Sequence, residues 1–255
     1  MIKLTFLGTG TSQGVPIIAC KCPVCKSTNF KDKRLRASVL IHVDGQNLVI
    51  DSGPDFRYQM LRAGVENISA ILFTHEHKDH TAGLDDIRAF NWVNKEAVNI
   101  YAEKRVQTSL RKEFSYVFAE FKYPGIPQMN LIDVTNEAFH INGTKIQPIR
   151  AMHLKLPVYG YRIGDLVYIT DANYIAMEEK EKMKGAKVLI LNALRKEKHI
   201  SHFTLSEALE LVKELKPEKA YFTHISHQMG FHDEVQAELP DNVFLAYDQL
   251  EIEID

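Results

Sequence analysis

Three histidines and one aspartate lie within a single six-residue segment of this 255-residue chain, at His75, His77, Asp79 and His80. Imidazole nitrogens and carboxylate oxygens are common ligands of divalent ions in proteins. His75 and His77 are two residues apart, so in an extended loop both can point to the same side and share one ion. Asp79 and His80 would face elsewhere, which suits a second ion nearby. The segment therefore predicts one corner of a binuclear metal site rather than a solvated polar loop.

Two ions need more than four ligands, and three further candidates follow short apolar runs, as the first segment does. They are His153, Asp171 and His224. His153 and His224 could instead be structural histidines, and Asp171 could cap a turn. The repeated position after an apolar run favours the metal site, and a carboxylate such as Asp171 can bridge two divalent ions and reduce their mutual repulsion.

The three cysteines of the chain, Cys20, Cys22 and Cys25, also lie within six residues. Their odd number and close spacing do not fit the disulfide framework of a secreted protein. They fit a thiolate metal site, although three reduced cysteines in a mobile loop are the alternative. A closed tetrahedral zinc site needs four ligands, so a histidine must supply the fourth.

Strands are expected to position these side chains. Short runs rich in β-branched and aromatic residues, bounded by Gly, Asn or Asp, predict strands over 2–7, 37–43, 47–51, 69–73, 98–101, 145–150, 157–162, 166–170, 187–192, 219–223 and 243–253. Helical patterns lie between them, over 55–63, 83–93, 104–118, 175–184, 204–215 and 231–238. Hairpins come early and strand–helix alternation comes late in each half. The pattern predicts an α/β protein in which two halves pack sheet against sheet with helices outside, as one domain over residues 1–255.

The composition excludes some classes of protein. The formal net charge is −2 and 45% of residues are hydrophobic, so the whole chain has no charge signature of nucleic-acid or membrane binding. The apolar run at the N-terminus is too short for a signal peptide, and no run approaches a membrane span. We expect a cytoplasmic protein.

The pattern His-x-His-x-Asp-His at 75–80 resembles the hallmark of the metallo-β-lactamase superfamily. The resemblance implies an αββα sandwich of two mixed sheets with helices on the outer faces, and a binuclear hydrolase. Within the superfamily the chain resembles the phosphoribosyl cyclic phosphodiesterases of the carbon–phosphorus lyase pathway, which degrades phosphonates. The segments that carry this similarity are 8–10, 12–16, 20–25, 223–227 and 247–248.

The resemblance implies a role for each candidate ligand. One ion would be held by His75, His77 and His153, the other by Asp79, His80 and His224, with Asp171 bridging and a hydroxide between the ions as nucleophile. Manganese or zinc would suit these ligands. By the same resemblance Asp79 and Asp171 count among the catalytic residues, and His227 completes a structural zinc site with the cysteines.

His202 occupies the place where the family has a histidine before a late helix. We predict it as the general acid for the leaving group, because an imidazole near its unperturbed pKa can donate a proton at neutral pH. Its neighbour His199 competes for this role, and an exposed loop histidine is the alternative.

The predicted substrate is a small phosphodiester, with a cyclic ribose phosphate implied by the resemblance. Lys155 is either a phosphate contact or a surface lysine, and the aromatic stretch 114–123 either stacks on a base or sugar or packs in the core or a dimer contact. A homodimer is the family precedent. Two alternatives stay open, a nuclease of the transfer-RNA 3′-processing type and an accessory protein that binds metal without turnover. We expect no membrane partner and no nucleic-acid partner.

Overall fold

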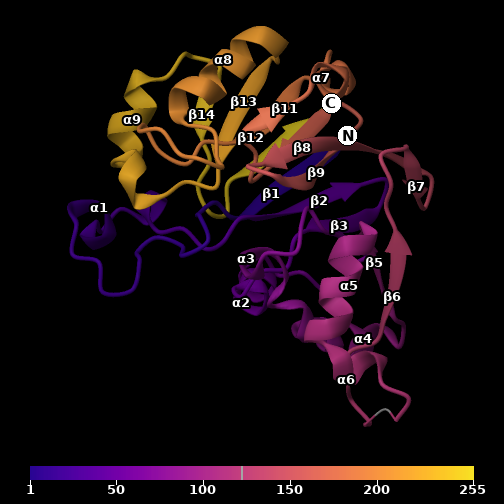
Figure 1. Cartoon of the computed structure of the whole chain (residues 1–255). Helices are drawn as coiled ribbons and strands as arrows, with labels where there is room; N and C mark the ends of the chain where they lie inside the picture. The colour runs from indigo at the N-terminus through magenta and orange to yellow at the C-terminus, as the bar shows by residue number, and fades with distance from the viewer. Residues whose placement is uncertain (122) are drawn as a thin grey trace.

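The computed structural model describes residues 1–121 and 123–255, and it contains two mixed β-sheets with helices on both sides (Figure 1). In spatial order the strands of the first sheet are β15 (Glu251–Ile254), β1 (Ile2–Gly8), β2 (Ser38–Val43), β3 (Gln46–Ile50), β4 (Ala70–Leu72), β5 (Val98–Ala102) and β6 (Met129–Asp133). Those of the second sheet are β11 (Tyr174–Ile175), β8 (Thr144–His153), β9 (Leu156–Ile163), β10 (Leu166–Ile169), β12 (Val188–Asn192), β13 (Lys219–Thr223) and β14 (Val243–Leu245), and β7 (Phe139–Ile141) pairs with β8.

Both sheets have the same construction. β1, β2 and β3 are antiparallel, and β3 to β6 then run parallel; β8, β9 and β10 are antiparallel, and β10, β12, β13 and β14 then run parallel. The β2–β3 turn, Asp44-Gly45, has positive φ at both residues, as a tight two-residue hairpin requires. Parallel strands end at the same edge of a sheet, which brings together the loops that follow them.

The apolar core fills three layers. Side chains from both sheets, among them Phe6, Ile41, Tyr161 and Tyr168, pack between the sheets. One further cluster lies between the first sheet and its helices, and another lies between the second sheet and its helices. This is the four-layer αββα sandwich that the sequence predicted, so the fold prediction is confirmed.

The helices cover the outer faces of the sheets. On the first sheet these are α2 (Phe56–Arg62), the 3₁₀ helix η2 (Leu84–Ile87), α4 (Arg88–Asn94), α5 (Lys104–Glu113) and α6 (Ser115–Phe118), and on the second α7 (Met177–Met183), α8 (Leu205–Leu215) and α9 (His232–Glu238). Four single-turn elements remain, α1 (Pro23–Lys26), η1 (Phe30–Asp32), α3 (Lys78–Thr81) and η3 (His227–Met229). α8 begins with a capping box between Thr204 and Glu207. Among the described residues, no helix combines the length and apolar character needed to cross a membrane.

Two predictions about elements were wrong. The run 243–253 is not one strand: it forms β14 in the second sheet and β15 in the first. The break lies at Asp248, whose carboxylate accepts hydrogen bonds from the backbone N–H groups of Thr9 (2.9 Å) and Leu35 (2.8 Å). The helix predicted over 104–118 is interrupted at Phe114, where φ and ψ are −101° and 43°, so α5 and α6 are separate. β6 and β7 were missed, and few of their residues are buried.

Candidate metal centre

The candidate ligands lie where strands end. His75 is in the loop after β4, His153 is the last residue of β8, Asp171 follows β10 closely and His224 directly follows β13. Asp171 (φ 53°) and His224 (φ 54°) have left-handed backbones, which is uncommon for residues other than glycine. Each side chain is thereby turned sharply out of its strand direction at the shared edge. Such conformations persist only where the surrounding structure holds them, and they cluster at functional sites.

Asn192 is the group that fixes the turn at Asp171. Asn192 is the last residue of β12, and its side chain is fully buried. Its Oδ1 accepts the N–H of Ala172 (2.8 Å) and its Nδ2 donates to the carbonyl of Ala172 (2.9 Å). Both backbone polar groups of Ala172, the residue after Asp171, are therefore hydrogen-bonded to the Asn192 side chain. Sequence reasoning did not identify Asn192, although it ends an apolar run as the ligands do.

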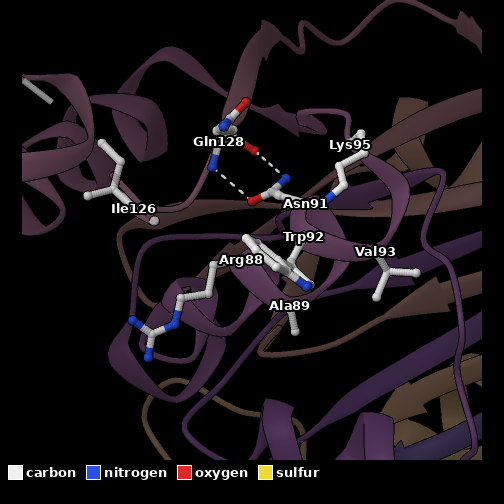
Figure 2. Close-up of a pocket in the computed structure, with 9 residues that line it drawn as sticks. Arg88, Ala89, Asn91, Trp92, Val93, Lys95, Ile126 and Gln128 are labelled. Atoms are coloured by element: carbon white, nitrogen blue, oxygen red, sulfur yellow. Dashed lines mark hydrogen bonds between the residues drawn. The ribbon is translucent and has the colours of Figure 1, made fainter. Parts of the chain in front are cut away.

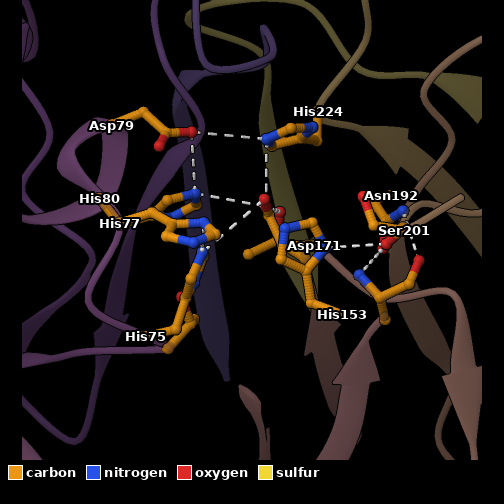
Figure 3. Close-up of polar contacts among 12 residues, drawn as sticks. His75, His77, Asp79, His80, His153, Asp171, Asn192, Ser201 and His224 are labelled. Carbon is orange, nitrogen blue, oxygen red and sulfur yellow. Dashed lines mark hydrogen bonds and ion pairs between the residues drawn. The ribbon is translucent and has the colours of Figure 1, made fainter. Parts of the chain in front are cut away.

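His75, His77 and His153 form the first group (Figure 3), and their ligand atoms lie within 4.8 Å of one another. His153 Nδ1–H donates to the Ser201 carbonyl at 2.8 Å, which leaves Nε2 free for an ion. His75 Nδ1 lies 3.0 Å from the hydroxyl of Thr74. That hydroxyl donates its proton to Asp51, so His75 Nδ1–H must donate to it. His75 Nε2 then carries no proton and lies 2.9 Å from His77 Nδ1, so these two nitrogens face a common point where one ion could bind.

Asp79, His80, Asp171 and His224 form the second group (Figure 3). The one-turn helix α3 begins at Lys78, inside the motif rather than after it, and it directs Asp79 and His80 inward. His80 Nε2 lies 3.1 Å from Asp79 Oδ2, and His224 Nε2 lies 3.7 Å from the same oxygen. The structure therefore places His75 and His77 in one group and Asp79 and His80 in the other.

Asp171 lies between the two groups. Its Oδ1 is 3.3 Å from His80 Nε2 and 3.1 Å from His224 Nε2, whereas its Oδ2 is 3.9 Å from His75 Nε2. One oxygen therefore faces each group. This is the arrangement that a carboxylate bridging two ions requires.

The charges of the site are strongly coupled. Burial alone would raise the pKa of Asp171, but His224 and His80 hold it well below its usual range. Burial likewise tends to lower the pKa of His224, but Asp171 and Asp79 raise it to about 9. Nε2 of His80 and Nε2 of His224 are buried and have no well-directed hydrogen-bond partner among the described residues. Buried nitrogens without partners, facing buried carboxylates, fit a divalent cation as the missing partner.

Asp51 is a site residue that the sequence analysis missed. It is fully buried after β3 and accepts hydrogen bonds from His80 Nδ1 at 2.7 Å and from the Thr74 backbone N–H and hydroxyl at 2.9 and 2.8 Å. A carboxylate behind a ligand histidine fixes the tautomer of the ring and directs Nε2 to the ion. The signal was present, since Asp51 follows an apolar run just as Asp171 does.

Cys20, Cys22, Cys25 and His227 form a separate group, again with ligand atoms within 4.8 Å of one another. His227 Nδ1 lies 3.2 Å from Cys22 Sγ and 3.6 Å from Cys20 Sγ. The hydrogen bond from His227 lowers the pKa of Cys22 to about 6, which favours the thiolate. Three thiols facing one imidazole nitrogen fit a tetrahedral zinc ion.

The cysteine loop is held beside the catalytic groups. Ile225 N–H donates to the Thr9 carbonyl (2.9 Å), and Thr11 N–H donates to the Ile225 carbonyl (3.2 Å). Ile225 directly follows the ligand His224, so the N-terminal loop is hydrogen-bonded to the segment that carries both His224 and His227.

His202 lies in the site, with its ring centroid 4.6 Å from that of His153 and 4.8 Å from that of His224. Burial, reinforced by His224, lowers the pKa of His202 to about 3. The premise of an unperturbed pKa was therefore wrong, because the side chain of His202 is buried against His153 and His224. The ring centroid of His199 lies 5.0 Å from that of His202, and His199 is only partly buried. Lys155 is exposed in the β8–β9 turn.

The aromatic stretch does not form one surface. Phe114 is buried, whereas Tyr116 (43% exposed), Phe121 (85%) and Tyr123 (74%) are open to solvent; Lys122 lies outside the described residues. A cavity of about 690 Å³ nearby is lined by α4, with Trp92 and Arg88, and by the segment before β6 (Figure 2). None of the candidate ligands lines this cavity, so it is separate from the metal centre.

Comparison with known proteins agrees with the fold and the motif. A family model described as the beta-lactamase superfamily domain matches residues 46–225. The chain belongs to this superfamily, as a metal-dependent hydrolase with the metallo-β-lactamase fold. Within it the chain lies close to the PhnP family: a crystal structure described as a new diphosphatase from that family has a TM-score of 0.93 and 39% identity, covering 100% of this chain and 98% of that one.

Two further relatives extend the comparison. A protein of Porphyromonas gingivalis (strain ATCC BAA-308 / W83) named octanoyltransferase is 40% identical over 257 residues, which is all of this chain and 52% of the relative. The chain therefore spans about half the length of that relative. Zinc-bound PqqB from Methylobacterium extorquens has a TM-score of 0.76 at 18% identity, covering 99% of this chain and 100% of that one, and shares the fold.

Proposed function

We propose that the chain is a binuclear-metal-dependent phosphodiesterase that hydrolyses a small phosphodiester. The observation that carries the proposal is the position of Asp171, one oxygen of which faces His80 and His224 while the other faces His75. In this assignment His75, His77 and His153 hold one ion, and Asp79, His80 and His224 hold the other. Manganese or zinc suits both ligand sets.

Two divalent ions in these positions would supply an activated water and neutralise charge on the phosphate. The surrounding protein residues hold and orient the histidine ligands. Asp51 keeps the His80 proton on Nδ1, and the Ser201 carbonyl does the same for His153. His202, beside His153 and His224, is our candidate to protonate the leaving oxygen. A phosphate anion bound beside it would raise its pKa from the low value set by burial.

A second candidate function is hydrolysis of a diphosphate. It is favoured by the 39% identity and 0.93 TM-score to the PhnP-family protein whose description names it a diphosphatase. The two reactions make similar demands on the protein, because water attacks a phosphorus in each. The bond that breaks joins this phosphorus to an ester oxygen in a phosphodiester and to the bridging oxygen in a diphosphate. Lys155, exposed two residues beyond His153, is our candidate contact for the second charged group.

We also propose a structural zinc ion held by Cys20, Cys22, Cys25 and His227. It would fasten the N-terminal loop to the segment that carries His224. A homodimer is a further proposal, which light scattering of the purified protein would test.

The test of the proposed function is hydrolysis of bis(p-nitrophenyl) phosphate by the purified protein with added manganese. We expect turnover by the wild type and none by Asp171→Ala, with Asp165→Ala as a matched control because Asp165 is a partly exposed carboxylate that pairs with Lys187 and belongs to neither ligand group. Full activity in Asp171→Ala would overturn the bridging role. A panel of cyclic ribose phosphates, cyclic nucleotides, diphosphates and short RNAs then separates the candidate substrates.

A further inference from the structure

A chain of side chains with alternating charge begins at Glu76, beside the first group of candidate ligands, which comprises His75, His77 and His153. Glu76, between the ligands His75 and His77 in sequence, accepts a hydrogen bond from Arg105 Nη1. Arg105 Nη2 lies 3.3 Å from Glu103, and the other oxygen of Glu103 accepts from Arg150 at 2.9 Å. This charge chain consists of Glu76, Arg105, Glu103 and Arg150. The side chains of all four residues are partly buried, which reduces the screening that weakens exposed ion pairs.

Arg105 is the member that connects two ligand-bearing segments. With Nη1 it holds Glu76 in the motif loop, and with Nη2 it donates to the carbonyl of Pro157 in β9 at 2.6 Å. Pro157 pairs with Met152, next to His153 at the end of the β8–β9 hairpin. One guanidinium therefore joins the loop that carries His75 and His77 to the hairpin that carries His153.

Few other polar contacts join these two segments. Tyr159 N–H donates to the Thr74 carbonyl at 3.0 Å, and Tyr161 OH donates to the Phe73 carbonyl at 2.6 Å. Both hold the beginning of the motif loop, whereas Arg105 acts at its centre. The ligands Asp79, His80 and His224 are held by other contacts, including that of Asp51 with His80.

We propose that Arg105 is a positioning residue that sets the distance between His75 and His77 on one side and His153 on the other, and thereby the affinity of the ion that these histidines share. The inference rests on the ligand assignment of the proposed function. The planar guanidinium suits the role, because its two terminal nitrogens can bond two fixed acceptors at once, which an ammonium group cannot do with the same geometry. Loss of a partner that hydrogen-bonds a metal ligand directly typically weakens metal binding by roughly 10- to 100-fold. Arg105 acts through Glu76 and the Pro157 carbonyl rather than on a ligand itself, so we expect the lower end of that range.

The test is a manganese titration of the chelator-stripped full chain, followed by the electron paramagnetic resonance signal of free Mn²⁺. Manganese is the probe because thiolates bind it poorly, so the cysteine group does not contribute. The wild type should bind two ions, and His153→Ala identifies the step that belongs to the first group. Arg105→Ala should weaken that step by about 10-fold and leave the other within about threefold. Arg105→Lys should restore part of the loss.

Lys104→Ala is the matched control, because Lys104 neighbours Arg105 on α5 and its side chain is 84% exposed. If Arg105→Ala does not fold, Glu76→Gln keeps the shape and removes one charge of the same contact, and should weaken the same step. A purely structural role would lower the melting temperature of the stripped protein without changing the ratio of the two affinities. An unchanged ratio therefore overturns the inference. Fewer than two ions in the wild type would instead contradict the proposed ligand assignment.

Discussion

Asp51→Asn tests how far the metal centre depends on a residue that touches no ion. In the wild type Asp51 Oδ2 faces two donors, His80 Nδ1 and the Thr74 hydroxyl, and Oδ1 faces the Thr74 N–H. An asparagine must place its NH₂ group at the position of one of these two oxygens. In either orientation the NH₂ group, which is a donor, faces another hydrogen-bond donor. The simplest relief is for His80 to move its proton to Nε2, which is the nitrogen that should bind the ion.

The expected cost follows from this geometry. The lost bond joins a fully buried carboxylate and a fully buried histidine at 2.7 Å, and hydrogen bonds to charged groups are worth about 1.5–3 kcal/mol. We therefore expect the affinity for the ion bound by His80 to fall roughly 10- to 100-fold, which is about 1.4–2.8 kcal/mol. Activity at limiting metal should fall in proportion and recover in part at high metal.

The assay is competition between the protein and a chelating indicator for Mn²⁺, with turnover of bis(p-nitrophenyl) phosphate measured on the same samples. Asp165→Asn makes the same chemical change at a partly exposed ion pair outside both ligand groups and should behave as the wild type. Thermal melting checks that Asp51→Asn is folded. A folded Asp51→Asn protein with wild-type affinity would refute the argument, because the carboxylate would then not control the His80 tautomer.

Three further predictions follow from other parts of the structure. Cys22→Ser should reduce the zinc content by one ion per chain while both manganese sites remain, and unchanged zinc by elemental analysis would count against the cysteine site. Gly53→Ala should destabilise the fold by roughly 1–3 kcal/mol and weaken metal binding, because a Cβ there would lie 2.0 Å from the Asp79 carbonyl oxygen; wild-type melting and affinity would contradict this. In stripped protein the pKa of His224 is raised to about 9 and that of His80 is also raised, so both must lose protons to bind ions. Apparent affinity should therefore rise with pH from about 6.5 to 9 while the melting temperature of the stripped protein falls over the same window, and an affinity that falls with pH would exclude this protonation state.

Much of the site could be predicted from the sequence because its ligands are local in the chain or follow a repeated pattern. His75, His77, Asp79 and His80 stand in one segment, and the position after an apolar run identified the later candidates. The same alternation of apolar runs and helical patterns predicted two sheets with helices outside. The element boundaries were mostly correct, since burial of an apolar face leaves a periodic signal in the residues themselves.

Only the tertiary structure showed how the residues act on one another. Asp51 is 29 positions from His80, and Arg105 is also 29 positions from Glu76, so no local pattern connects them. The low pKa of His202 has the same origin, because burial among ligands from other strands cannot be inferred from its neighbours in sequence.

The sequence by itself determined which side chains could bind metal, since the chemistry of histidine, aspartate and cysteine does not depend on the fold. The tertiary structure decided which of them meet and which carboxylate oxygen faces which group. It also divided the run 243–253 between two sheets, because the contacts of Asp248 with Thr9 and Leu35 are long-range and override the local strand pattern. Long-range hydrogen bonds of this kind depend on the packing of the whole chain, and that packing leaves no local trace.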